Sequence, residues 1–243
     1  MRTLVVLPTY QEADNIVNVL RRLHAVVPSA TVLVVDDGSP DGTASLAEAA
    51  GAEFGGIEVL RRPGKTGLGS AYRHGFRWGL ARDFDVMVEM DADLSHNPAE
   101  LPRLLAAIDE GADLVVGSRY VPGGSIPDWT WRRRALSRWG NRYAAAMLGL
   151  EIADATSGFR AYRAKVLADL DSVWVRADGY GFQIEMAYLI AQLGYRIVEV
   201  PISFTDRTEG HSKMSSSIVV EALALVTWWG VRDRWQRRHL GTR

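Results

Sequence analysis

The sequence contains no cysteine among its 243 residues. This absence excludes disulfide bonds, a thiolate nucleophile and cysteine-ligated zinc, so a bound metal would need oxygen or histidine ligands. The net charge at neutral pH is only −1, and a charge this small creates no field that would attract nucleic acid. We therefore expect no nucleic-acid partner.

Long hydrophobic runs are also absent. The first apolar run, residues 4–7, stops at Pro8 and is too short for the core of a signal peptide. The most apolar later stretch, residues 218–231, is interrupted by Glu221 and falls short of the roughly 20 residues that cross a bilayer. We expect no membrane-spanning segment.

Two common nucleotide-binding motifs are missing as well. Residues 64–69, GKTGLG, resemble part of a phosphate-binding loop, but Val59 stands where the Walker A motif needs its first glycine. No G-x-G-x-x-G follows the first apolar run. These absences argue against a P-loop NTPase and a nicotinamide-dependent dehydrogenase, and we interpret residues 64–69 as a flexible entry to a helix.

The near-zero charge conceals two halves of opposite sign. Residues 1–128 carry 11 Lys and Arg against 18 Asp and Glu, a net charge of −7, whereas residues 129–243 carry 17 against 11, a net charge of +6. Seven of the eight tryptophans also lie in the second half. The later segment therefore combines cationic and aromatic side chains.

Short β-branched runs alternate with amphipathic stretches along the first half of the chain. This alternation indicates an α/β fold with a mostly parallel central sheet and helices on both faces. Strands are predicted near residues 4–7, 32–35, 57–60, 85–90, 114–116 and 196–200. Helices are predicted near residues 12–26, 43–50, 68–81, 98–109, 133–148, 182–193 and from 216 onward. The length suits one catalytic domain, residues 1–215, followed by an amphipathic helix and basic tail, residues 216–243, packed on or beside it.

Polar residues follow four of the predicted strands. They occupy residues 8–12, 36–39, 91–93 and 117–119. Because ligands bind at the carboxyl ends of strands in such sheets, we expect one polar cleft there. Turn formation and helix capping explain Ser39 and Asp41, which leaves Asp37, and as a weaker candidate Asp36, to contact a ribose or a base.

The strongest local signal is the pair Asp91 and Asp93, which follows a buried apolar run. Two carboxylates at this spacing can bind one hard cation, and oxygen ligands together with a diphosphate suit Mg²⁺ or Mn²⁺. Taken alone, the same residues are better explained by a turn before the helix that starts at residues 97–98.

Seven segments together resemble family 2 glycosyltransferases of the GT-A fold, and specifically the dolichol-phosphate and polyprenol-phosphate mannose synthases. They occur in the family's order over about residues 3–215, and they are LPTYQE at 7–12, DDGSPDGT at 36–43, GKTGLG at 64–69, MDADLSH at 90–96, GSRY at 117–120, TSGFRAY at 156–162 and HSK at 211–213.

The resemblance implies a Rossmann-like fold that binds a nucleotide sugar, and it implies roles for individual residues. It assigns nucleotide contacts to Pro8, Tyr10, Glu12, Val35 and Asp37. It assigns metal and diphosphate contacts to Asp91, Ala92 and Asp93, with Ser95 reaching the metal through water. It assigns sugar or phosphate contacts to Arg119, Arg207 and Lys213, and it makes Asp93, Arg119 and Lys213 the catalytic residues.

The resemblance also implies the reaction: transfer of mannose from GDP-mannose to a polyprenyl phosphate, with a divalent metal and inversion at the sugar. A phosphate monoester has a second pKa of about 6 and is largely ionised at neutral pH, so this acceptor needs no general base. We expect Arg132, Arg133 and Arg134 to receive the acceptor phosphate, although a solvated helix start is an equal alternative.

A lipid acceptor implies a membrane surface as partner, and Trp129 and Trp131 beside the arginines suit such an interface. We expect peripheral attachment at the cytoplasmic face, with a membrane protein as a further partner. The final helix suits either a place at the interface or packing of its Leu and Val residues in the core, with equal weight. Two alternatives remain at this point: a UDP-glucose-dependent transferase acting on the same lipid, and a non-catalytic protein that binds a sugar nucleotide.

Overall fold

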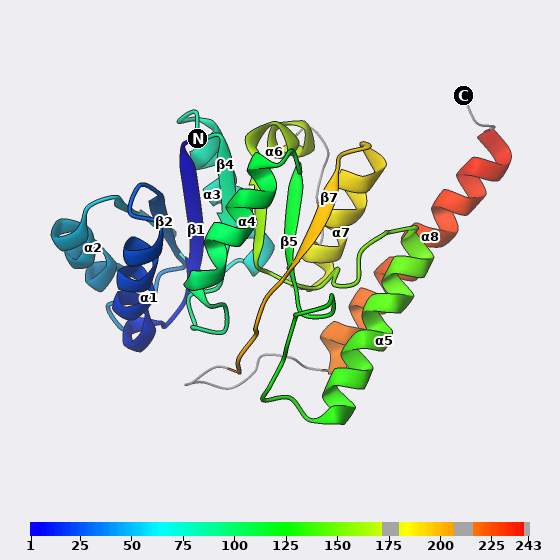
Figure 1. Cartoon of the computed structure of the whole chain (residues 1–243), viewed down its shortest axis with the longest axis horizontal. Helices are drawn as coiled ribbons and strands as arrows, with labels where there is room; N and C mark the ends of the chain where they lie inside the picture. Colours follow the sequence, from blue (N-terminus) through cyan, green and yellow to red (C-terminus); the bar gives the residue numbers. More distant parts are fainter. Residues whose placement is uncertain (172–179, 207–215, 241–243) are drawn as a thin grey trace.

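A seven-stranded sheet with strand order β3-β2-β1-β4-β6-β5-β7 forms the centre of the molecule (Figure 1). The computed structural model describes residues 1–171, 180–206 and 216–240. All neighbouring strands are parallel except that β6 runs antiparallel to β4 and β5. The strands are β1 (Thr3–Thr9), β2 (Thr31–Asp36), β3 (Ile57–Arg61), β4 (Val86–Glu89), β5 (Leu114–Ser118), β6 (Arg160–Arg163) and β7 (Ile197–Pro201). The predicted mostly parallel sheet is confirmed.

Helices cover both faces of this sheet, as expected for strands that are apolar on both sides. One face packs against α1 (Ala13–Val26), α2 (Thr43–Phe54) and α4 (Leu101–Asp109), the last preceded by a 3₁₀ turn, η1 (Pro98–Glu100). The other face packs against α3 (Leu68–Leu80), α6 (Ala164–Asp171) and α7 (Tyr180–Gln192). In α1 the buried residues recur at helical spacing: Ile16, Val19, Leu20 and Leu23.

A third apolar cluster lies beyond β7, where α5 (Trp131–Leu148) and α8 (Ser216–Leu240) lie side by side (Figure 1). Ala144 and Leu148 of α5 pack with Val226 and Trp229 of α8 and with the buried side of α7. Gly230 permits this approach, because a Cβ atom there would lie 2.6 Å from the carbonyl oxygen of Met147. The last helix is therefore part of the folded body.

Two elements have no counterpart among the predictions, namely β6 and α6. Together with β7 they extend the sheet and its helical cover beyond β4. The other helices and strands lie within a few residues of their expected positions.

Candidate active site

The carboxyl ends of β1 and β2 bring together the residues expected to contact the nucleotide. Pro8 pairs with Val35 in the parallel register, and Thr9 pairs with Asp36. The hydroxyl of Thr9 donates to Asp36 at 3.0 Å, and Ser39 donates to the same carboxylate through its backbone N–H and its hydroxyl. Asp36 is therefore engaged in holding the loop.

Asp37 faces a different partner, the guanidinium of Arg62. The two buried side chains form an ion pair at 2.7 Å, and Arg62 also donates to Thr66 and to Ser70. Burial raises the pKa of Asp37, although the Arg62 charge opposes this shift. Arg62 was absent from the predicted site, yet it fixes the carboxylate that we expected to meet the nucleotide.

Hydrogen bonds from the next loop hold the segment that contains Tyr10 and Glu12. The backbone N–H of Gln11 donates to Ser39 at 3.0 Å, and that of Glu12 donates to Thr43 at 3.0 Å. The ammonium group of Lys65 lies 4.9 Å from the centre of the Tyr10 ring. Thus segments after β1, β2 and β3 meet at one edge of the sheet.

The segment after β4 contains the predicted metal ligands. Asp93 is buried, and its carboxylate accepts the backbone N–H of Ser95 at 3.0 Å. Asp91 is half-buried and accepts the Tyr72 hydroxyl at 3.3 Å, while its backbone N–H donates to Nδ1 of His96 at 3.2 Å. Both carboxylates are thus held at the strand end, with buried Ala92 between them.

The structure also limits what the protein alone can offer a metal ion. Within residues 1–171, 180–206 and 216–240, no group of three or more His, Asp or Glu side chains is placed to hold one. The hydroxyl of Ser95 is buried and has no hydrogen-bond partner among the described residues. A metal at this site would depend on ligands beyond the two carboxylates.

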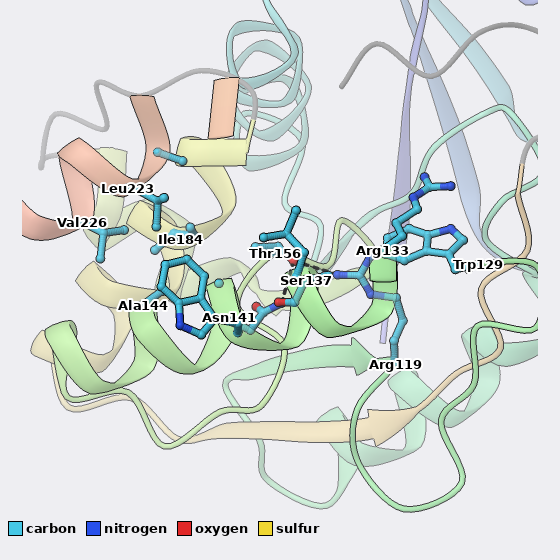
Figure 2. A pocket seen from close by; sticks show the side chains of 14 residues that line it. Arg119, Trp129, Arg133, Ser137, Asn141, Ala144, Thr156, Ile184, Leu223 and Val226 are labelled. Atoms are coloured by element: carbon cyan, nitrogen blue, oxygen red, sulfur yellow. Dashed lines mark hydrogen bonds between the residues drawn. The ribbon is translucent and has the colours of Figure 1, made fainter. Parts of the chain in front are cut away.

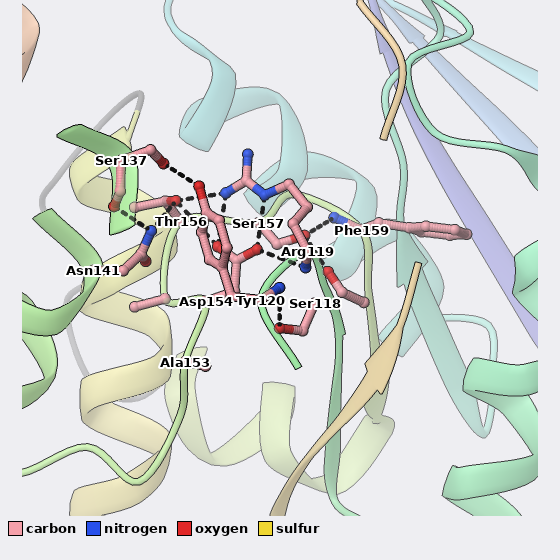
Figure 3. Close-up of polar contacts among 12 residues, drawn as sticks. Ser118, Arg119, Tyr120, Ser137, Asn141, Ala153, Asp154, Thr156, Ser157 and Phe159 are labelled. Carbon is pink, nitrogen blue, oxygen red and sulfur yellow. Dashed lines mark hydrogen bonds and ion pairs between the residues drawn. The ribbon is translucent and has the colours of Figure 1, made fainter. Parts of the chain in front are cut away.

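Arg119 follows β5 and is held by a bidentate ion pair with Asp154 (Figure 3). Its Nε and Nη2 atoms each donate to the Asp154 carboxylate at 2.7 Å, and Nη2 also donates to Thr156 at 2.7 Å. Burial by itself raises the pKa of Asp154, but the charge and hydrogen bonds of Arg119 outweigh it, so this pKa is lowered.

Among the three predicted acceptor arginines, only Arg133 turns toward this region. Its guanidinium lies 3.8 Å from the centre of the Trp129 ring and forms an ion pair with Asp206 at 3.0 Å. Arg132 and Arg134 are exposed. Trp129 is buried, so the expectation that it lies at a membrane surface is wrong; its indole donates to Asp206 at 2.8 Å instead. Arg207 and Lys213 lie outside the described residues.

An apolar cavity lies between α5, α7 and α8, and Arg119 and Arg133 stand at one end of it (Figure 2). Its walls include Leu136 and Ala144 of α5, Ile184 of α7 and Leu223 of α8. These walls come from three helices far apart in the chain.

Solved structures share this fold. A solved mannosyltransferase from Pyrobaculum calidifontis, crystallised with GDP-Man and Mn²⁺, aligns with a TM-score of 0.59 and 16% identity over 100% of this chain and 76% of that one. This likeness shows that the chain has the fold of the GT-A glycosyltransferases.

The family follows from the sequence comparison. Residues 4–171 match the model described as glycosyl transferase family 2. The chain is 51% identical to the polyprenol monophosphomannose synthase of Mycolicibacterium smegmatis, over 97% of this chain and 89% of that protein. It is also 51% identical to the undecaprenyl-phosphate mannosyltransferase of Micrococcus luteus, over 99% of this chain and 100% of that protein. The chain therefore belongs to glycosyl transferase family 2 and is a glycosyltransferase.

No helix in the part of the chain that the structure describes has both the length and the apolar character required to cross a membrane.

Proposed function

We propose that the chain transfers mannose from GDP-mannose to the phosphate of a polyprenyl phosphate, with inversion at the sugar. The observation that carries this proposal is the position of Arg119: its guanidinium, fixed by Asp154, stands at the polar end of an otherwise apolar cavity. A phosphate joined to a long hydrocarbon chain has the matching combination of charge and apolar surface. The names of the two relatives and the GDP-Man in the Pyrobaculum structure support it.

The donor nucleotide binds at the ends of β1 and β2 in this proposal, where Pro8, Tyr10, Glu12, Val35 and Asp37 lie. Support comes from the strand register, which makes these positions neighbours, and from the general rule that ligands bind at the carboxyl ends of the strands. The Asp37–Arg62 pair then offers a carboxylate in a fixed position to the ribose or the base.

Asp91 and Asp93 are the proposed ligands of Mg²⁺ or Mn²⁺, and Ala92 lies between them against the diphosphate. The donor set fits a hard cation, because it contains two carboxylates and the buried hydroxyl of Ser95, which has no hydrogen-bond partner in the described part of the chain and can reach the ion through water. When bound, the ion supplies charge neutralisation at the departing diphosphate. Mn²⁺ in the Pyrobaculum structure supports this assignment.

The acceptor phosphate is its own nucleophile, because a phosphate monoester is already largely ionised at neutral pH. The protein therefore needs to hold and neutralise phosphate groups rather than remove a proton. Arg119 and Arg133 are placed for this at the cavity mouth, where their positive charge favours a phosphate group. The family pattern adds Arg207 and Lys213 to these groups, with Arg119 and Lys213 beside Asp93 as the catalytic residues.

The surroundings of the reaction follow from the acceptor. A polyprenyl chain is held in a bilayer, so we place the enzyme peripherally at the cytoplasmic face of the membrane, with a membrane protein as a further partner. The packing of α8 against α5 and α7 supports a role for residues 216–243 on the acceptor side of the catalytic domain.

Arg119→Lys tests the assignment of the acceptor site. Lysine keeps a positive charge near Asp154 but cannot keep the two hydrogen bonds to Asp154 while also donating to a phosphate, so the KM for polyprenyl phosphate should rise at least about tenfold. Transfer is measured as labelled mannose extracted into organic solvent. The affinity of the nucleotide site for GDP is measured by calorimetry. Unchanged GDP affinity with a raised acceptor KM is the expected pattern; an unchanged acceptor KM would remove Arg119 from the acceptor site.

A further inference from the structure

Residues 202–205, which follow β7, join two loops of the site. The backbone N–H of Thr205 donates to the carbonyl oxygen of Ser95 at 3.3 Å, in the loop after β4 that contains the proposed metal ligands. The backbone N–H of Phe204 donates to the carbonyl oxygen of Ser125 at 3.0 Å, in the loop after β5 that begins with the proposed phosphate-binding arginine. The segment therefore fixes these two loops relative to each other.

The side chain of Phe204 lies between the same two loops. Its ring centre is 5.6 Å from that of His96, whose Nδ1 atom accepts the backbone N–H of Asp91 at 3.2 Å. The guanidinium carbon of Arg119 lies 5.5 Å from the centre of the Phe204 ring. One half-buried aromatic ring thus stands between the segment that holds the metal ligands and the arginine at the acceptor side.

Further aromatic rings extend this contact on both sides. The Trp129 ring meets the Phe204 ring edge to face, with 5.8 Å between the ring centres, and it lies 5.7 Å from the guanidinium carbon of Arg119. On the other side, the Phe159 ring stacks on His96 at 5.3 Å. We call these four rings the aromatic cluster: His96, Phe159, Phe204 and Trp129. Except for Phe204, its members are at most 7% exposed.

Exclusion of water matters at this place because water competes with the acceptor. In hydrolysis, the oxygen of water bonds to the anomeric carbon, the bond from that carbon to the diphosphate breaks with its electron pair leaving on the nucleoside diphosphate, and a proton passes to solvent. In transfer, an oxygen of the acceptor phosphate forms the new bond instead. Apolar rings beside the charged groups keep water out and strengthen the charge interactions that remain.

We propose that Phe204 is a positioning residue that closes the space between the loop of the metal ligands and Arg119 to water, so that the sugar passes to the acceptor phosphate rather than to water. This inference rests on the proposed function, because it concerns the fate of the donor sugar. Phe204 stands at the centre of the aromatic cluster, between His96 and Trp129. A space left by its ring would be bordered by polar groups, and such a space admits water.

The division of labelled sugar between lipid and water tests the proposal. Phe204→Ala is incubated with labelled GDP-mannose, Mg²⁺ or Mn²⁺, and polyprenyl phosphate, and free mannose is separated from mannolipid by extraction and from unreacted donor by chromatography. The ratio of free mannose to mannolipid should rise at least about tenfold over that of the wild type. Phe204→Leu keeps much of the apolar volume and should cause a smaller rise. Calorimetry should show unchanged affinity for GDP in both variants.

Phe54→Ala is the matched control. Phe54 is also a half-buried phenylalanine, but it ends α2 and its ring stacks on His24, away from the loops of the site. Its removal should leave the ratio of free mannose to mannolipid at the wild-type value even where the melting temperature falls. Thermal unfolding checks that every variant is folded.

A wild-type ratio in Phe204→Ala, even with slower transfer, would overturn the proposal and leave the ring a purely structural role. The proposed function fails separately, if the wild-type chain forms no mannolipid. Release of free sugar from labelled GDP-mannose or UDP-glucose without acceptor still tests Phe204 in that case. Phe204→Ala should release free sugar at least about tenfold faster than the wild type, and an equal rate would overturn the proposal.

Discussion

Arg119 and Asp154 form a buried ion pair, and such a pair is costly unless further hydrogen bonds satisfy both charges. Asp154 also accepts the backbone N–H of Arg119 at 3.0 Å. The carboxylate of Glu199 on β7 in turn accepts the backbone N–H groups of Ala153 and Asp154 at 2.7 and 2.9 Å. These contacts hold the guanidinium in one orientation, with its Nε and Nη2 atoms bonded to Asp154.

Glu89 provides a prediction about pH at the residue scale. Burial raises the pKa of this carboxyl from 4.5 to about 7, although Arg160 opposes the shift. Between these values the folded protein keeps a proton that the unfolded chain loses, so stability falls as pH rises from about 4.5 to 7 and then levels off. The resulting loss of unfolding free energy is up to about 3 kcal/mol, and Glu89→Gln should abolish it because glutamine does not titrate.

Urea unfolding at pH 5 and pH 8 would measure the effect of Glu89→Gln. Glu58→Gln, at an exposed carboxyl on β3, should leave the wild-type pH profile intact. An equal change in unfolding free energy between the two pH values for wild type and Glu89→Gln would contradict the prediction.

The predictable residues of the site are those that follow apolar strands. Asp37, Asp91, Asp93 and Arg119 stand directly after β2, β4 and β5, so strand periodicity alone places them at one edge of the sheet. Their partners could not be predicted in this way. Asp154 lies 35 residues from Arg119 in a loop without apolar periodicity, and only the fold brings the two together.

At the element scale, the predictable strands are the apolar ones. The missed strand, β6, has only four residues, and two of them are arginines. Arg160 is fully buried and donates to the carbonyl oxygens of Ser157, Gln183 and Ala155 at 2.7–2.8 Å. A charged side chain satisfied by distant backbone groups leaves no hydrophobic pattern in the sequence, and α6, which follows immediately, was missed with it.

Gly230→Ala tests the packing of α8 at the same scale. The new Cβ would lie 2.6 Å from a backbone oxygen of α5, so α8 must shift away and the cavity between the helices must change shape. We expect a loss of about 1–3 kcal/mol in unfolding free energy and reduced transfer to polyprenyl phosphate, with GDP affinity unchanged.

Gly140→Ala is the matched control for Gly230→Ala, since a Cβ atom on this α5 glycine would meet no atom within 4 Å. It should be neutral or stabilising by up to about 1 kcal/mol, because alanine favours helix more than glycine does. Equal effects of the two substitutions on unfolding free energy would show that α8 does not pack on α5 as described.

At the scale of the whole molecule, the two charged halves of the sequence occupy different regions. The acidic half supplies β1 to β5 and the carboxylates at their ends, and the basic half supplies α5, α8 and the cavity between them. A net charge of −1 therefore describes neither region. In the proposed reaction the donor occupies the first region, the acceptor occupies the second, and Arg119 lies where they meet.

Transfer of labelled sugar by the purified chain tests the proposed reaction most directly. The chain is incubated with polyprenyl phosphate, Mg²⁺ or Mn²⁺, and either labelled GDP-mannose or labelled UDP-glucose, and the lipid product is extracted and its anomeric configuration determined. We predict label in the lipid from GDP-mannose, a β-linked mannosyl phosphate, and no product once the metal is chelated. Absence of mannolipid with GDP-mannose, or label entering the lipid only from UDP-glucose, would contradict the proposed function.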